Sequence, residues 1–160
     1  MTDTLRSICG QCARLSNPRL DFIPDELRRH KEIILRDLAE LVSSASAELK
    51  KSVVSLAGSI LEAVLFGFLK GQESYISARR GAEFAVDPQE SLRTYVNVFN
   101  RYFSGQFPKD LLPDFVVSYR DLIHVSREVA SSPEICHEAS RNMLRVLDTL
   151  LGELNQAAGP

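Results

Sequence analysis

The sequence has few of the residues on which several common kinds of protein site depend. Glycine occurs only 8 times in 160 residues, and the glycine-rich motifs of P-loop and dinucleotide-binding proteins are absent. Three cysteines make no sensible disulfide framework, so a reducing compartment is expected. The 19 Lys and Arg residues are outnumbered by 21 Asp and Glu, which disfavours a protein that coats duplex nucleic acid but leaves room for a local basic patch.

The sequence also lacks strand patterns, and this absence points to the fold class. No stretch alternates apolar and polar residues for long enough to predict a strand, whereas apolar residues recur every three or four positions. The sequence predicts one all-α domain, an antiparallel up-and-down helical bundle of four to five main helices joined by short loops. Residues 1–23 are expected to form an N-terminal helical extension and residues 24–156 the bundle.

Local signals place the expected elements along the chain. Leu5 to Leu15 suit one short helix, and Pro24-Asp25-Glu26 suits the start of the next helix. Asp87-Pro88-Gln89-Glu90 has the residues of another helix start. The remaining expectations are a connector over 71–86, an aromatic-rich helix up to Gly105, a helix over 113–124 and a last helix from Ser132-Pro133 onward.

The longest apolar run, Val53–Leu69, is interrupted by one acid, Glu62. It is slightly short for a membrane span, and a central acid costs about 2.5–3.5 kcal/mol on membrane-insertion scales. We therefore expect a buried core helix, no membrane partner and, since no N-terminal signal is visible, a cytoplasmic protein. A buried carboxylate must be paired or protonated, and Arg120 is an available partner, as is a backbone or hydroxyl donor. Glu62 is interpreted either as a satisfied core carboxylate or as an orienter of the residue pair described next.

The helix expected over 113–124 carries the main candidate site. Arg120 and His124 are four residues apart, which places them on one face of a helix, one turn from each other and on the flank of its apolar stripe. A guanidinium fits phosphate oxygens, and an imidazole exchanges protons near neutral pH. The alternative interpretation is an ordinary helix flank, with Arg120 solvated or paired with Asp121 or Glu128.

The segment Tyr119-Arg120-Asp121-Leu122-Ile123-His124 resembles the Arg-polar-x-x-His motif of the HEPN superfamily. Those proteins are small all-α domains, many of them metal-independent ribonucleases in toxin–antitoxin, phage-defence and RNA-processing systems, and others non-catalytic. Only three residues separate Arg from His here, fewer than is usual, and Val125 stands where the short-spaced variant often has Pro. The resemblance extends more weakly over residues 30–155, including the segment Ser59 to Ala63.

The resemblance implies a ribonuclease that uses no cofactor and no metal. His124 would move the proton, Arg120 would stabilise phosphoryl charge, and Asp121 would orient its neighbours, with Glu62 as a further candidate. It also implies a homodimer, a single-stranded RNA substrate and a small nucleotidyltransferase as antitoxin. The alternatives are a non-catalytic HEPN-like module that binds a partner protein or nucleotide, and a structural dimerisation bundle.

Cys9-Gly10-Gln11-Cys12 is a C-x-x-C motif that calls for a separate interpretation. A redox motif of this form is expected in a βαβ context, and a zinc site needs four ligands, which only His30, Cys136 and His137 could complete. We expect two partly buried thiols on a helix rather than a metal or redox site.

Overall fold

The chain folds as an all-α protein, as the sequence predicts. The computed structural model describes residues 3–119 and 133–159, with only the backbone described at 133–135, and no strand occurs in these stretches. The elements are α1 (Leu5–Gln11), α2 (Ala13–Ser16), the 3-10 turn η1 (Asp25–Leu27), α3 (Arg28–Ser46), α4 (Lys50–Gly71), α5 (Glu73–Arg80), α6 (Leu92–Phe103) and α8 (Pro133–Ala157). Residues 115–119 are also helical.

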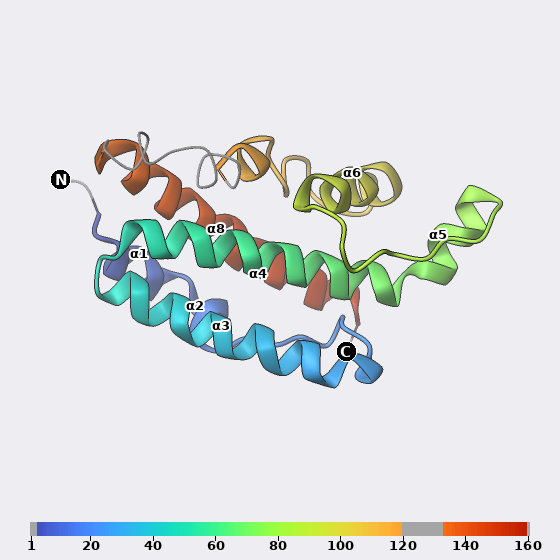
Figure 1. The fold of residues 1–160 in the computed structure, drawn as a ribbon, viewed down its shortest axis with the longest axis horizontal. Helices are drawn as coiled ribbons and strands as arrows, with labels where there is room; N and C mark the ends of the chain where they lie inside the picture. The colour runs from blue at the N-terminus through green and yellow to red at the C-terminus, as the bar shows by residue number, and fades with distance from the viewer. Residues whose placement is uncertain (1–2, 120–132, 160) are drawn as a thin grey trace.

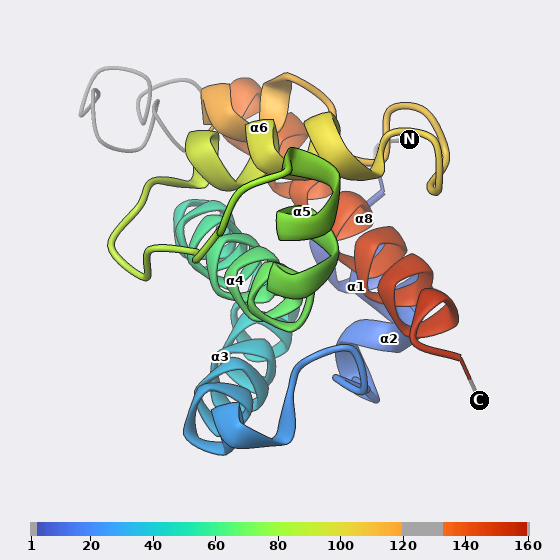
Figure 2. The ribbon, with the colours of Figure 1, turned by 90° about the vertical axis from the view of Figure 1, so that its right-hand side faces the viewer.

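Helix α4 lies at the centre of the fold, with α3, α6 and α8 packed around it (Figures 1 and 2). Four of its apolar residues, Val53, Ile60, Leu61 and Leu65, are 0–1% exposed. The prediction of a buried helix over Val53–Leu69 is therefore confirmed. In the part of the chain that the structure describes, α4 is the one helix long and apolar enough to cross a membrane, and 61% of its most apolar window is buried inside the fold.

A tight turn at residues 47–49 joins α3 to α4, so these two helices are antiparallel neighbours, whereas α8 runs in the same direction as α4 (Figures 1 and 2). Glu48 in this turn has a left-handed φ of 58°. Its carboxylate accepts hydrogen bonds from the amides of Leu5 (3.1 Å) and Arg6 (3.0 Å), and the Arg6 guanidinium donates to the Ser46 carbonyl at 2.9 Å. The amide of Arg6 is the main cause of a lowered Glu48 pKa. These bonds fasten the start of α1 to the α3–α4 turn.

The N-terminal segment forms two short helices, so the prediction of one helix was wrong. Cys12 leaves the helical region, with φ −95° and ψ 73°. The carboxylate of Asp148 on α8 replaces the lost intrahelical bond, since it accepts from the Arg14 amide at 2.9 Å and from its guanidinium at 3.1 Å. Two turns further along α8, the Asn155 amide donates to the Arg19 carbonyl at 2.7 Å. The segment contributes apolar residues to the main buried cluster: Leu5, Ile8, Leu15, Leu20, Phe22 and Ile23.

An aromatic cluster joins α6 to α4. The ring of Phe68 on α4 lies 5.7 Å from Phe99, 5.1 Å from Phe103 and 6.0 Å from Phe107, centroid to centroid. Phe99 and Phe103 are 1–2% exposed. Three aromatic residues of this helix, Tyr95, Phe99 and Phe103, thus belong to the core.

Two expectations between α4 and α6 were wrong. The predicted connector contains α5, which ends at Gly81, where a φ of 73° suits glycine. Helix α6 begins at Leu92 rather than at Asp87, because the Ser91 hydroxyl caps it by accepting from the Thr94 amide. Asp87 instead forms a local turn, in which its carboxylate accepts from the Gln89 amide at 2.8 Å. The last helix begins at Pro133 as predicted.

Close packing of the N-terminal segment on α4 predicts opposite effects for two glycine substitutions. A Cβ atom at Gly67 would lie 2.8 Å from Cδ1 and 2.9 Å from Cγ1 of the buried Ile23, whereas a Cβ at Gly10 would meet nothing within 4 Å. We expect Gly67→Ala to lower the free energy of unfolding by about 1–2 kcal/mol despite its better helix propensity. Gly10→Ala is expected to raise it by up to about 1 kcal/mol. Urea denaturation measures both, and an unchanged or raised stability for Gly67→Ala would contradict this packing.

Candidate functional site

Three of the four residues expected to form the site lie outside the described residues: Arg120, Asp121 and His124. The described chain leads to them through the helical residues 115–119, in which Val116 and Val117 are buried. The expected grouping of Glu62 with Arg120 and His124 therefore stays a prediction.

Glu62, the fourth expected residue, is half-buried on α4 and lines a cavity of about 260 Å³. His30 of α3 and Tyr95 of α6 line the same cavity. The rest of its wall is formed by Ser59, Ala63, Phe66 and Pro88. The acid that interrupts the apolar run thus lies where α3, α4 and the entry to α6 meet.

The imidazole of His30 has a defined structural partner. Its Nε2 lies 2.7 Å from the carbonyl oxygen of Ala63, so Nε2 carries the proton and donates it to α4. Its ring packs edge-on against Phe66, with centroids 5.1 Å apart. His30 therefore ties α3 to α4 beside Glu62.

Tyr95 is 2% exposed, and its hydroxyl donates to the Asp87 carbonyl at 2.6 Å. Burial raises the pKa of the Tyr95 phenol, and the negative charges of Glu62 and Asp87 raise it further. Tyr95 thus remains a neutral donor that holds the turn before α6.

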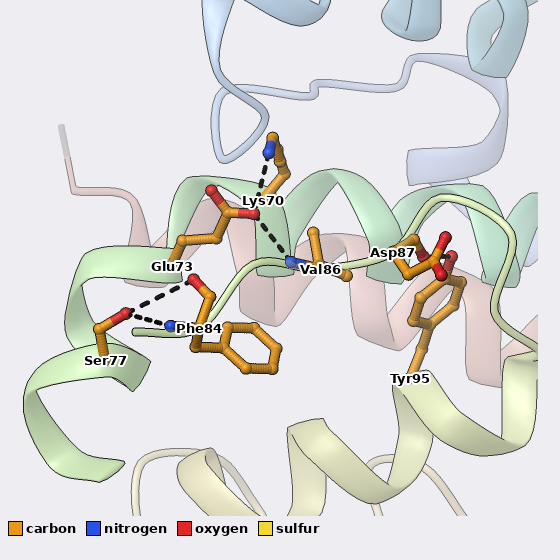
Figure 3. Close-up of polar contacts among 7 residues, drawn as sticks. All are labelled: Lys70, Glu73, Ser77, Phe84, Val86, Asp87 and Tyr95. Atoms are coloured by element: carbon orange, nitrogen blue, oxygen red, sulfur yellow. Dashed lines mark hydrogen bonds and ion pairs between the residues drawn. The ribbon is translucent and has the colours of Figure 1, made fainter. Parts of the chain in front are cut away.

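Two side chains of α5 fasten the loop that runs from α5 to α6 (Figure 3). The Glu73 carboxylate accepts from Lys70 Nζ at 2.9 Å and from the Val86 amide at 2.8 Å. The Ser77 hydroxyl accepts from the Phe84 amide at 2.9 Å. The Glu73 pKa is lowered, because the bonds from Lys70 and Val86 outweigh the effect of burial. The loop is therefore held at Phe84 and Val86, and Tyr95 holds it again at Asp87.

The cavity brings together a carboxylate, an imidazole and a phenol, groups that can exchange protons with a bound molecule. However, His30 and Tyr95 both donate to backbone carbonyls, so two of the three polar groups serve the structure. Glu62 is the third polar group that lines the cavity, and it stays the candidate functional group there.

The C-x-x-C cysteines have the properties of structural thiols. Cys9 and Cys12 are both 4% exposed. Burial, followed by the negative charge of Asp148, raises the pKa of both thiols, that of Cys12 to about 11. No group of three or more His, Cys, Asp or Glu residues that could hold a metal ion occurs within the described residues.

Sequence reasoning missed the residues that surround Glu62. His30 and Tyr95 lie 32 residues before and 33 residues after it, and no local spacing signals such a meeting. Arg80 falls in the predicted connector and Tyr102 in the predicted aromatic-rich helix, although both line a second pocket, between α5 and α6. The exposed Arg79-Arg80 pair, next to Gly81, was the one local feature of the sequence that could have indicated this second pocket.

Comparisons with known proteins give no match. No protein-family model matches the chain, and neither the curated proteins nor the solved structures contain a significant match.

The raised thiol pKa values predict slow alkylation of the native protein. Because the thiolate is the reactive form, Cys9 and Cys12 should stay unmodified by iodoacetamide at neutral pH and react once the protein is unfolded in urea. As the pH rises toward 11, the Cys12 thiolate forms and its modification should accelerate. Peptide mass spectrometry gives the modified fraction at each cysteine. Rapid modification of native Cys12 at neutral pH would contradict its burial.

Proposed function

We propose that this protein is a HEPN-like endoribonuclease that cleaves single-stranded RNA without a metal ion. The observation that carries the proposal is the segment Tyr119 to His124, in which an arginine, a polar residue and a histidine follow the spacing of the short HEPN motif. The all-α fold and the central, buried α4 support it, because HEPN domains are small helical bundles.

In the proposed reaction the 2′-hydroxyl of RNA attacks the adjacent phosphorus atom. The bond from phosphorus to the 5′-oxygen of the next nucleotide breaks, which leaves a 2′,3′-cyclic phosphate and a 5′-hydroxyl. His124 moves the proton that leaves the 2′-oxygen and the one that the departing 5′-oxygen requires. Arg120 stabilises the charge on the phosphoryl oxygens, and Asp121 orients its neighbours.

Glu62 enters the proposal as a positioning residue for Arg120 and His124. Its place in a cavity, as the one charged residue in the otherwise apolar stretch of residues 60–69, supports a polar role that an alanine or leucine would not fill. The competing interpretation, a core carboxylate with satisfied polar partners, predicts that Glu62→Gln alters stability without a specific effect on cleavage.

The proposal includes a cytoplasmic homodimer and, as antitoxin, a small nucleotidyltransferase. The four-residue spacing of Arg120 and His124 predicts that they flank the apolar stripe of a helix, and a second subunit would then supply the other wall of a cleft. We expect light scattering to show a dimer at tens of micromolar, where an interface of standard size holds. A monomer at that concentration would count against the paired site.

Cleavage of RNA tests the proposed function directly. The wild type should cut single-stranded RNA in the presence of EDTA and leave 2′,3′-cyclic phosphate ends. His124→Ala and Arg120→Ala should each lose a factor of about 10²–10⁴ in rate if they move the proton and stabilise charge. Product ends are identified by mass spectrometry, and circular dichroism checks that each variant is folded.

Matched controls separate these roles from a general effect of the substitutions. His137→Ala and Arg28→Ala remove the same residue types elsewhere, and the Arg28 side chain is 88% exposed. Both should keep the wild-type rate. Cleavage that persists in His124→Ala and Arg120→Ala would overturn the assignment, and a folded wild type that cuts no RNA would favour a non-catalytic HEPN-like module.

A further inference from the structure

A second pocket lies between the end of α5, the loop after it and α6. Its volume is about 350 Å³, within the roughly 300–1,000 Å³ typical of small-molecule sites. It is lined by Arg80, Phe84, Asn97, Val98, Arg101 and Tyr102. The lining therefore combines two cations, two aromatic rings and an amide, and contains no acidic residue among these six.

The two arginines of this pocket lack a countercharge in the part of the chain that the structure describes. Neither Arg80 nor Arg101 forms an ion pair there, whereas Arg14, Arg19, Arg28 and Arg36 each have a carboxylate partner. Both side chains are exposed at the pocket. A guanidinium presents a planar fork of donors that matches phosphate oxygens, so the pair favours an anionic ligand.

The aromatic residues are held in place before any ligand binds. The backbone of Phe84 is fastened to Ser77 by the hydrogen bond from its amide at 2.9 Å (Figure 3). Tyr102 is half-buried on α6, and the Arg101 guanidinium lies 5.5 Å from the centre of its ring. A half-exposed ring beside an arginine is the kind of surface on which nucleobases stack. A preorganised wall also reduces the entropic cost of binding.

We propose that the α5–α6 pocket binds a nucleotide. The base packs against Phe84 and Tyr102, and the phosphate accepts hydrogen bonds from Arg80 and Arg101. The Asn97 side-chain amide, which both donates and accepts, pairs with the edge of the base. The ligand is either a free nucleotide or one unit of a single-stranded RNA, since both present the same base and phosphate.

None of the residues that line this pocket belongs to the Arg120–His124 motif, so the binding proposal is tested independently of the proposed cleavage. Binding is therefore measured with a probe that cannot be cleaved. A 2′-O-methyl oligoadenylate has no free 2′-hydroxyl to attack phosphorus, so its affinity does not depend on whether the protein is a ribonuclease.

The experiment titrates the full-length protein into fluorescently labelled 2′-O-methyl oligoadenylate and follows anisotropy, with unlabelled AMP as competitor. Arg80→Gln, Arg101→Gln and Tyr102→Leu should each weaken binding about 5- to 100-fold, the range expected for lost stacking or phosphate contacts. Each arginine variant should also flatten the dependence of affinity on salt, by about one unit of logarithmic slope. Arg28→Gln removes the same charge from α3 and is the matched control.

The outcomes distinguish a free nucleotide from an RNA strand as the ligand, and some of them would overturn the proposed binding site. Competition by AMP indicates a free nucleotide as ligand, whereas tight oligonucleotide binding that AMP does not displace indicates an RNA strand, and both support the pocket. If Arg28→Gln weakened oligonucleotide binding as much as the pocket variants do, the binding would depend on the overall positive charge of the protein surface, and the proposed pocket would be overturned. A folded wild type that binds neither the labelled oligonucleotide nor, by isothermal titration calorimetry, AMP would also overturn it, even if that protein cleaves RNA.

Discussion

Burial of α4 is the constraint on which the rest of the structure depends. Its buried residues form a broad apolar face that α3, α6 and α8 cover, whereas Ser52, Ser55 and Ser59 lie on an exposed side (Figure 2). Full burial of one large apolar side chain stabilises a fold by about 1.5–3 kcal/mol. The N-terminal segment extends this cover, because Ile23 packs against the backbone of α4 at Gly67. Glu62 is then a polar residue within an apolar stretch of α4, at the place where α4 meets α3 and the entry to α6.

The loop from α5 to α6 determines which surfaces are open to ligands. Glu73 and Ser77 hold it against α5, and Tyr95 holds it against α6 (Figure 3). The cavity around Glu62 lies where this loop enters α6, and the arginine and aromatic pocket lies where the loop leaves α5. One fixed loop thus contributes Pro88 to the first site and Phe84 to the second.

The long helices could be predicted from the sequence because their apolar residues repeat with the helical period. The period places Ile34, Leu38 and Leu41 on one face of α3, and all three are buried. The start of α6 was predicted wrongly because two possible helix starts lie close together in the sequence. Asp87-Pro88 has the residues of a helix start, but Ser91 caps the helix that forms. Neither pocket could be predicted, because residues such as Arg80 and Arg101, or His30 and Tyr95, meet only through the packing of separate helices. The roles of Arg120, Asp121 and His124 stay predictions from the motif.

Photocrosslinking of bound RNA tests most directly the proposals that this helical protein binds single-stranded RNA at the Arg120–His124 motif and that the α5–α6 pocket, where its ligand is an RNA strand, binds a unit of that strand. A 2′-O-methyl oligonucleotide that contains 4-thiouridine is irradiated with the wild-type protein, and the modified peptides are identified by mass spectrometry. The expected result is cross-links within residues 80–102 and 115–128. Cross-links confined to α1, α2 or α3, or none above the level of a denatured control, would contradict these proposals.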